Sequence, residues 1–155
     1  TDDVPSSSVV QHVIDQVHSQ SSQYEYFVLL QPTSPLRTSD HIDQAVTLFK
    51  IKRPDSVISV TVLEHPVDWI GVLDDGSIMK EFSCLDQSTK DDSKSTNHFR
   101  INGAIYLSRV NFDKKKPGPS IWGEYCVGYR MPWRASIDID TPSDLILAEA
   151  LLGQC

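Results

Sequence analysis

The sequence predicts an α/β domain with a largely parallel sheet. Two short apolar runs rich in β-forming residues, 26–30 and 56–62, each follow a segment whose apolar residues have helical spacing. Strands joined by helices in this way usually run in parallel, with both faces of the sheet covered. At 155 residues the chain has the length of one domain with a real core. We therefore expect a single domain over 1–155, with a hairpin and loop extension at about 64–99.

The first helix is predicted near the start of the chain, where Ser6, Ser7 and Ser8 precede apolar residues spaced for one helical face (Val9, Val10, Val13, Ile14 and Val17). A serine at this point can cap the helix. Helix N-termini also bind anions, so a functional role for these serines stays open beside capping.

The first strand, 26–30, ends abruptly in the loop Q-P-T-S-P-L-R at 31–37. Two prolines exclude continuation of a helix or of a strand ladder there. Ligands of open α/β sheets bind at the carboxyl ends of strands. The loop therefore fits a ligand site and a proline-stiffened turn about equally well.

Ser39 or Asp40 is expected to cap the next helix, which leads into the strand at 56–62. Residues 69–77 then indicate a hairpin with an Asp-Gly turn, and 83–98 is polar enough for a long loop. In the predicted strand at 99–107, Arg100 and Asn102 share one face. The small pair Gly103-Ala104 permits close approach of a neighbour or a ligand. A last helix follows Thr141 and Pro142.

The stretch S-I-D-I-D-T at 136–141 carries the most distinctive chemistry. Read as a strand, it places Asp138 and Asp140 on one face and the two isoleucines on the other. Two carboxylates so close repel one another, and a cation such as Mg²⁺ between them relieves the repulsion. The alternative is an exposed strand end with two solvated acids.

Composition excludes several functional classes. The formal charge of −7 argues against a nucleic-acid partner and against an anionic membrane surface, which need clustered Lys and Arg. No apolar run approaches the roughly 18 residues of a membrane span. The three cysteines show no paired spacing and indicate free thiols in a reducing, cytoplasmic setting.

Three motifs together resemble the acylneuraminate cytidylyltransferases: L-L-Q-P-T-S-P-L-R at 29–37, N-G-A-I-Y at 102–106 and S-I-D-I-D-T at 136–141. This family comprises the CMP-sialic acid synthetases and the related enzymes for legionaminic and pseudaminic acids. The resemblance runs from about Thr1 to Leu152. It implies a Rossmann-like nucleotide-diphosphosugar transferase sandwich and a homodimer formed through an extension. It also implies a reaction, in which the anomeric hydroxyl of a nine-carbon keto-acid sugar attacks the α-phosphate of CTP and releases pyrophosphate.

The resemblance assigns roles to residues of this chain. It implies that Asp138 and Asp140 are catalytic and hold Mg²⁺, which would bridge phosphate oxygens. Nucleotide contacts fall on Ser6, Ser8 and Gln31, and Gln31 also reaches the sugar. The remaining sugar-side positions are Thr33, Arg100, Asn102 and Tyr106, with the arginine suited to the sugar carboxylate.

The chain also departs from the family pattern. Family members begin with a strand and a Gly-, Ser-, Lys- and Arg-containing loop that grips the triphosphate, and neither is present here. We therefore expect a partial domain that keeps the metal and sugar side, and little activity from the 155-residue chain alone. Trp69 stands near a position where some relatives carry lysine, which leaves the identity of the acyl sugar open.

Other readings compete with this one. Metal-dependent glycosyltransferases also use Asp-x-Asp, but they place it mid-chain, whereas about fifteen residues follow Asp140 here. A haloacid-dehalogenase phosphatase needs a threonine two residues after its second aspartate, which Thr141 is not. The octulosonate cytidylyltransferases remain an alternative, as does a catalytically incomplete module that acts through binding or dimer contacts.

Overall fold

The computed structural model describes residues 6–19, 24–73, 75–77, 79–80, 98–110 and 123–153. The chain divides into two compact units, of which the first combines Thr1–Thr61 with Ile101–Cys155 and the second is Val62–Arg100. The extension predicted at about 64–99 falls inside the range of the second unit.

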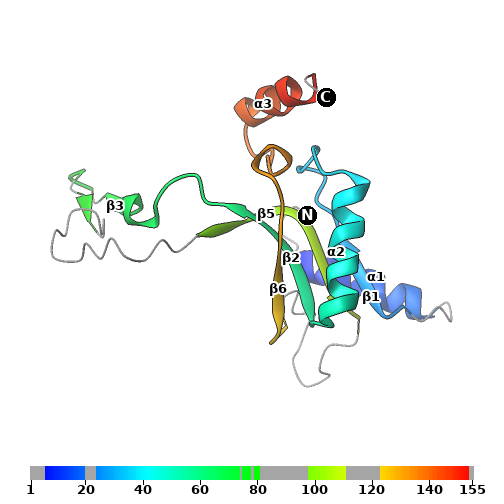
Figure 1. Ribbon diagram of the computed structural model, residues 1–155. Coiled ribbons are helices and arrows are strands. Elements are labelled where there is room, and N and C mark those ends of the chain that lie inside the picture. Colours follow the sequence, from blue (N-terminus) through cyan, green and yellow to red (C-terminus); the bar gives the residue numbers. More distant parts are fainter. Residues whose placement is uncertain are drawn as a thin grey trace. The chain divides into compact units, whose positions relative to one another are not determined.

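The first unit is built on a four-stranded sheet with the order β1-β5-β2-β6 (Figure 1). Its strands are β1 (Tyr26–Leu29), β2 (Ser56–Val62), β5 (Phe99–Arg109) and β6 (Cys126–Arg130). β2 pairs with β6 in parallel, and β1 pairs with β5 antiparallel. β5 is also antiparallel to β2, because Arg109 N donates to Asp55 O at 3.1 Å and Leu63 N donates to His98 O at 2.9 Å. Three strands therefore run in one direction, and β5 runs against them.

The predicted α/β class and both early strands are confirmed, but their neighbours differ from the expectation. β1 and β2 run in the same direction, as strands joined by a helix should. They do not pair with each other, because β5 lies between them. β5 has the burial that this central place requires, since Ile105 and Leu107 are fully buried.

The core of the first unit lies between the sheet and α2 (Ser39–Lys52). Ala45 and Phe49 of α2 pack in one buried cluster with residues of three strands and of the segment after β6 (Val57, Ala104, Ile105, Leu107, Tyr129, Met131 and Ala135). Burial of the larger members, such as Phe49, Ile105 and Leu107, contributes about 1.5–3 kcal/mol each. This packing makes the sheet a rigid base for the loops at its carboxyl end.

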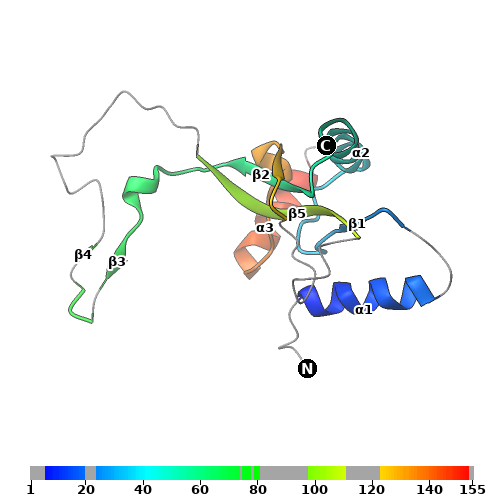
Figure 2. The same cartoon turned by 90° about the horizontal axis from the view of Figure 1, so that it is seen from below.

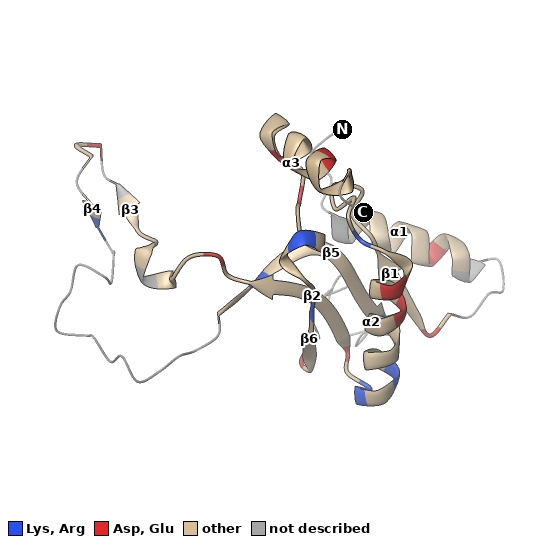
Figure 3. Ribbon diagram, turned by 45° about the horizontal axis from the view of Figure 1, so that its top comes forward, with Lys and Arg blue, Asp and Glu red and all other residues tan. Residues whose placement is uncertain are grey.

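The ends of α2 follow from local chemistry. The predicted cap at Ser39 or Asp40 is wrong: Thr38 is the N-cap and forms a capping box with His41, which satisfies the free backbone N–H groups one residue earlier. The helix ends at Arg53, which adopts a left-handed conformation with φ 50°. Lys50 and Lys52 lie in the last turn, where the helix dipole favours positive charge (Figure 3).

The other two helices differ in how well the sequence foretold their starts. α3 (Pro142–Leu152) has Thr141 as N-cap with Asp144 completing a capping box, so its predicted start is confirmed. α1 (Ser6–Ser19) begins at Ser6, so the serines occupy its first turn. In the described ranges, no helix is both long enough and apolar enough to cross a membrane.

The second unit contains a short 3₁₀ helix, η1 (Val67–Trp69), and an antiparallel hairpin of β3 (Val72–Leu73) and β4 (Met79–Lys80) (Figure 2). The predicted hairpin is confirmed. Its first strand begins at Val72 and not at Trp69, because residues 67–69 form the 3₁₀ turn after Pro66. Most of the predicted polar loop at 83–98 lies outside the described residues.

A buried hydroxyl in β2 gives a stability prediction. Thr61 is 1% exposed, and its Oγ1 has no hydrogen-bond partner in the described structure. A buried hydroxyl without a partner destabilises the fold, so Thr61→Val, which keeps the shape, should raise the free energy of unfolding by about 1 kcal/mol. Urea denaturation measures this. Thr47→Val is the control, because the Thr47 hydroxyl already donates to Asp43 O at 2.8 Å; equal gains in both variants would contradict the prediction.

Candidate active site

The loop that follows β1 is tied to the middle of β5. The Gln31 carbonyl accepts hydrogen bonds from Ser34 N at 3.3 Å and from Arg37 Nη1 at 3.1 Å. The same Arg37 nitrogen donates to Ala104 O at 2.8 Å. Arg37 is partly buried, and this burial lowers the pKa of its guanidinium. One arginine therefore fixes the backbone at Gln31 against β5.

Gly103 of β5 is the point where the side chains of Gln31 and Asp138 meet. Its φ is +75°, a conformation that favours glycine. A Cβ at Gly103 would lie 2.6 Å from Gln31 Oε1 and 2.9 Å from Asp138 Oδ2. Both oxygens thus lie against the bare glycine, and the predicted close approach at this position is confirmed.

The strand expected at 136–141 is wrong. The segment is irregular and joins η4 (Trp133–Ala135) to α3. Its tie to the site is a hydrogen bond to a loop, since Ile139 N donates to Thr33 O at 2.8 Å. Ile137 is buried as expected, but strand alternation does not place Asp138 and Asp140 on one face: Asp138 is half-buried and Asp140 is exposed.

Asp138 is the most unusual group of the site. Its Oδ1 is buried and has no hydrogen-bond partner in the described residues. The pKa of the Tyr106 phenol is raised, mainly by burial and in addition by the negative charge of Asp138. A buried carboxylate oxygen without a partner is costly, so this atom is suited to a cation or another ligand.

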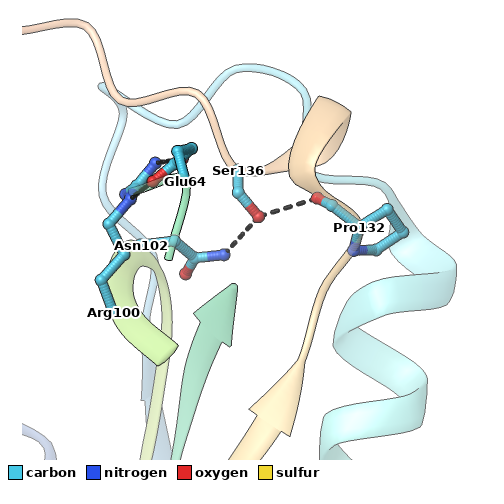
Figure 4. Close-up of polar contacts among 5 residues, drawn as sticks. All are labelled: Glu64, Arg100, Asn102, Pro132 and Ser136. Atoms are coloured by element: carbon cyan, nitrogen blue, oxygen red, sulfur yellow. Dashed lines mark hydrogen bonds and ion pairs between the residues drawn. The ribbon is translucent and has the colours of Figure 1, made fainter. Parts of the chain in front are cut away.

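Asn102, on the same strand as Gly103, is buried in the protein. It is 1% exposed, and its side-chain amide donates to Ser136 Oγ at 2.8 Å, as Figure 4 shows. Ser136 Oγ in turn donates to Pro132 O at 2.8 Å. The predicted sugar-side residue is thus enclosed by the protein in this structure.

Arg100 belongs to the second unit, where it forms an ion pair with Glu64. Arg100 Nη2 lies 2.8 Å from Glu64 Oε1, and Nε donates to the same carboxylate (Figure 4). The hydrogen bond from Arg100 is the main reason that the pKa of Glu64 is lowered. The charge of Arg100 is therefore already balanced by a carboxylate.

The structure brings part of the predicted set together. Gln31 and Asp138 meet at Gly103, and the charge of Asp138 raises the pKa of Tyr106. Thr33 is tied to the same site through its backbone carbonyl. Ser8 lies exposed on α1, and the side chain of Ser6 lies outside the described residues.

Three residues with structural roles at the site escaped the sequence reasoning. Arg37 ends the first motif and could have been singled out as its only charged member. Ser59 carries no local signal, because a serine inside a strand is ordinary until its distant partner is known. Ser136 opens the motif S-I-D-I-D-T, but the motif does not show that its hydroxyl bonds to Asn102.

The chain is similar to curated cytidylyltransferases along almost all of its length. It is 36% identical over 149 residues to N-acylneuraminate cytidylyltransferase of Escherichia coli O18:K1:H7, a match that covers 96% of this chain and 34% of the relative. N-acylneuraminate cytidylyltransferase of Streptococcus agalactiae serotype V is 31% identical over 122 residues, covering 77% of this chain and 28% of that protein. CMP-N,N'-diacetyllegionaminic acid synthase of Legionella pneumophila is 29% identical, covering 94% of this chain and 63% of the relative. The chain thus spans only part of each of these relatives.

Among solved structures, the fold is similar to 4-diphosphocytidyl-2C-methyl-D-erythritol synthase from Anaerococcus prevotii, with a TM-score of 0.56 at 12% identity, over 91% of this chain and 64% of that chain. This likeness confirms the Rossmann-like α/β fold. No family model matches the sequence. On these sequence matches, the chain is a homologue of the N-acylneuraminate cytidylyltransferases and of the legionaminic acid synthase over the part of each that it spans.

Proposed function

We propose that this chain supplies the metal side and the sugar side of an acylneuraminate-type cytidylyltransferase. The reaction transfers CMP from CTP to the anomeric hydroxyl of a nine-carbon keto-acid sugar and releases pyrophosphate. The names of the relatives support this chemistry. The observation that carries the proposal is the unpartnered, buried Asp138 oxygen at the place where Gln31 meets β5.

The donor set fits Mg²⁺. Asp138 and Asp140 would hold the ion, because carboxylate oxygens suit a hard cation and Asp138 Oδ1 has no other partner in the described residues. No group of three His, Cys, Asp or Glu side chains that could hold a metal occurs in the described ranges. A site with one or two carboxylates is the usual one for Mg²⁺, which takes its other ligands from phosphates and water. Bound there, the ion would neutralise phosphate charge and lower the pKa of the attacking hydroxyl.

The protein's own groups position the reactants. Gln31 offers its side-chain amide to the substrates from a loop fixed by Arg37, which limits the loss of entropy on binding. The Tyr106 phenol has a pKa above its ordinary value, is protonated at neutral pH, and can therefore donate a hydrogen bond to the sugar. Thr33, Arg100 and Ser8 remain proposed contacts, and Arg100 must share its guanidinium between Glu64 and a sugar carboxylate.

The second unit supports a proposed homodimer. It exposes large apolar side chains on and beside the hairpin, namely Val67, Trp69, Ile70, Val72 and Met79. A surface of this kind is typical of a protein–protein contact.

A cytoplasmic location belongs to the same proposal, because a free, exposed thiol at Cys126 fits a reducing compartment.

Binding of the reaction product tests the proposal directly. Calorimetric titration with CMP-N-acetylneuraminic acid should give binding that requires Mg²⁺, and this sugar should bind more tightly than CMP-octulosonate. Binding that does not depend on Mg²⁺ would indicate a non-catalytic module. Tighter binding of CMP-octulosonate would indicate an octulosonate cytidylyltransferase instead. A pyrophosphate-release assay with CTP and N-acetylneuraminic acid measures turnover directly.

A further inference from the structure

A network of hydrogen-bonded, buried polar side chains connects β2, β5 and the segment that carries Asp138. Its members are Ser59, Asn102 and Ser136, with exposed fractions of 0%, 1% and 0%. Buried polar groups of this kind are costly unless every one has a partner, and a fully satisfied network specifies one arrangement of the elements that it joins.

The first half of the network shapes β5 around Gly103. Asn102 Oδ1 accepts a hydrogen bond from Ala104 N at 3.2 Å, across the glycine. Ser59 Oγ lies 2.6 Å from the same oxygen and accepts from Ile105 N at 2.7 Å. Side chains therefore bind the two backbone N–H groups that follow Gly103. This holds the strand in the conformation that turns the bare glycine toward Gln31 and Asp138.

The second half fixes the segment that carries Asp138. Asn102 Nδ2 donates to Ser136 Oγ at 2.8 Å, and Ser136 Oγ donates to Pro132 O at 2.8 Å (Figure 4). Ser136 lies two residues before Asp138. No strand ladder holds this segment, so the buried serine and the Ile139–Thr33 hydrogen bond serve in its place.

The amide of Asn102 has no capacity left for a ligand. Its oxygen accepts from Ser59 and Ala104, and its nitrogen contacts Ser136 and, at 3.5 Å, Met131 Sδ. An asparagine side chain has two donor hydrogens and two acceptor lone pairs, so the set is complete. A direct contact with sugar would have to break one of these buried bonds.

We propose that Asn102 is a positioning residue. Together with Ser59 and Ser136, its hydrogen bonds hold Asp138 in its position beside Gly103. This proposal rests on the proposed function for its metal readout, but the positioning itself is a property of the folded chain. It replaces the sugar contact that the family resemblance implies for Asn102.

The test removes the serine that Asn102 holds. Ser136→Ala should speed amide hydrogen exchange in the peptide that contains Ile139, which reports the placement of the segment without any ligand. It should also raise the Mg²⁺ concentration needed for half-maximal binding of CMP-N-acetylneuraminic acid by about tenfold, the usual scale for groups that orient metal ligands. The ratio of affinities for CMP-N-acetylneuraminic acid and CMP should stay unchanged, because no sugar contact is lost.

Two further variants make the test decisive. Ser108→Ala is the matched control, because Ser108 is an equally buried serine of β5 whose hydroxyl contacts a backbone carbonyl, Asp55 O at 3.4 Å. It should alter neither readout. Ser136→Thr keeps the hydroxyl and should restore wild-type exchange if the site accepts the methyl group. The double variant Asn102→Ser/Ser136→Ala should change hydrogen exchange and Mg²⁺ dependence no more than Asn102→Ser alone. Both substitutions remove the same hydrogen bond, the one between Asn102 and Ser136.

The outcomes separate the two proposals. Wild-type chain that fails to bind the CMP-sugar with Mg²⁺ contradicts the proposed function, and the exchange data still decide the positioning role. Unchanged exchange near Ile139 in Ser136→Ala, or an equal change in Ser108→Ala, overturns the positioning role. If Asn102→Ser lowers the ratio of affinities for CMP-N-acetylneuraminic acid and CMP while Ser136→Ala changes neither readout, Asn102 contacts the sugar directly.

Discussion

Replacing Gly103 by alanine is expected to abolish Mg²⁺-dependent binding of CMP-sugar while the chain still folds. The new Cβ would lie 2.6 Å from Gln31 Oε1 and 2.9 Å from Asp138 Oδ2, closer than real contacts allow. Both side chains would have to leave the place where they meet. The φ of +75° adds a conformational cost of about 1–2 kcal/mol for a residue with a Cβ. The variant therefore combines a moderate loss of stability with a complete loss of site geometry.

Thermal unfolding and calorimetric titration measure the two effects of Gly103→Ala separately. Gly128→Ala in β6 is the matched control, because its Cβ would meet only Val60 side-chain carbons, at an ordinary 3.4 Å and beyond. That variant should bind CMP-sugar as the wild type does. Wild-type affinity in Gly103→Ala would show that Gln31 and Asp138 do not act together.

Replacing Asp138 by asparagine is expected to lower Mg²⁺ affinity at least a hundredfold and to leave stability unchanged or slightly raised. The carboxylate is the half-buried member of the pair, and its Oδ1 has no partner among the described groups. A neutral amide of the same shape relieves the cost of holding a charge there. Loss of one of two carboxylate ligands removes a large part of the attraction for a divalent cation. Function and stability should therefore change in opposite directions, as is common for active-site groups.

Magnesium titration followed by CMP-sugar binding measures the effect of Asp138→Asn. Asp43→Asn is the control, because Asp43 is an exposed aspartate of α2 and its loss tests the effect of net charge alone. The double variant Asp138→Ala/Asp140→Ala extends the test to both acids. If its magnesium affinity equals that of the wild type, these two residues are not the metal site.

Local chemistry made much of the fold predictable. The β-branched run at 56–62 is confirmed as β2 with its residues almost all buried, because a continuous apolar run is typical of a strand covered on both faces. Thr141 with Asp144 marked the start of α3 through the pairing of side chains with free backbone N–H groups. At the site, the local pattern indicates Gly103 and Asp138, whereas the role of Gln31 follows from the family resemblance.

Sequence alone determined the class of fold, the positions of most strands and helices, and the residue types from which the site is made, because these depend on neighbours along the chain. The tertiary structure decided that β5 lies antiparallel between β1 and β2, and that residues 136–141 form no strand. It also decided that Asn102 lies buried between Ser59 and Ser136. Such pairings join residues from 34 positions apart (Asn102 and Ser136) to 83 positions apart (Tyr26 and Arg109). The free energy that selects them comes from burial and hydrogen bonding across the whole core.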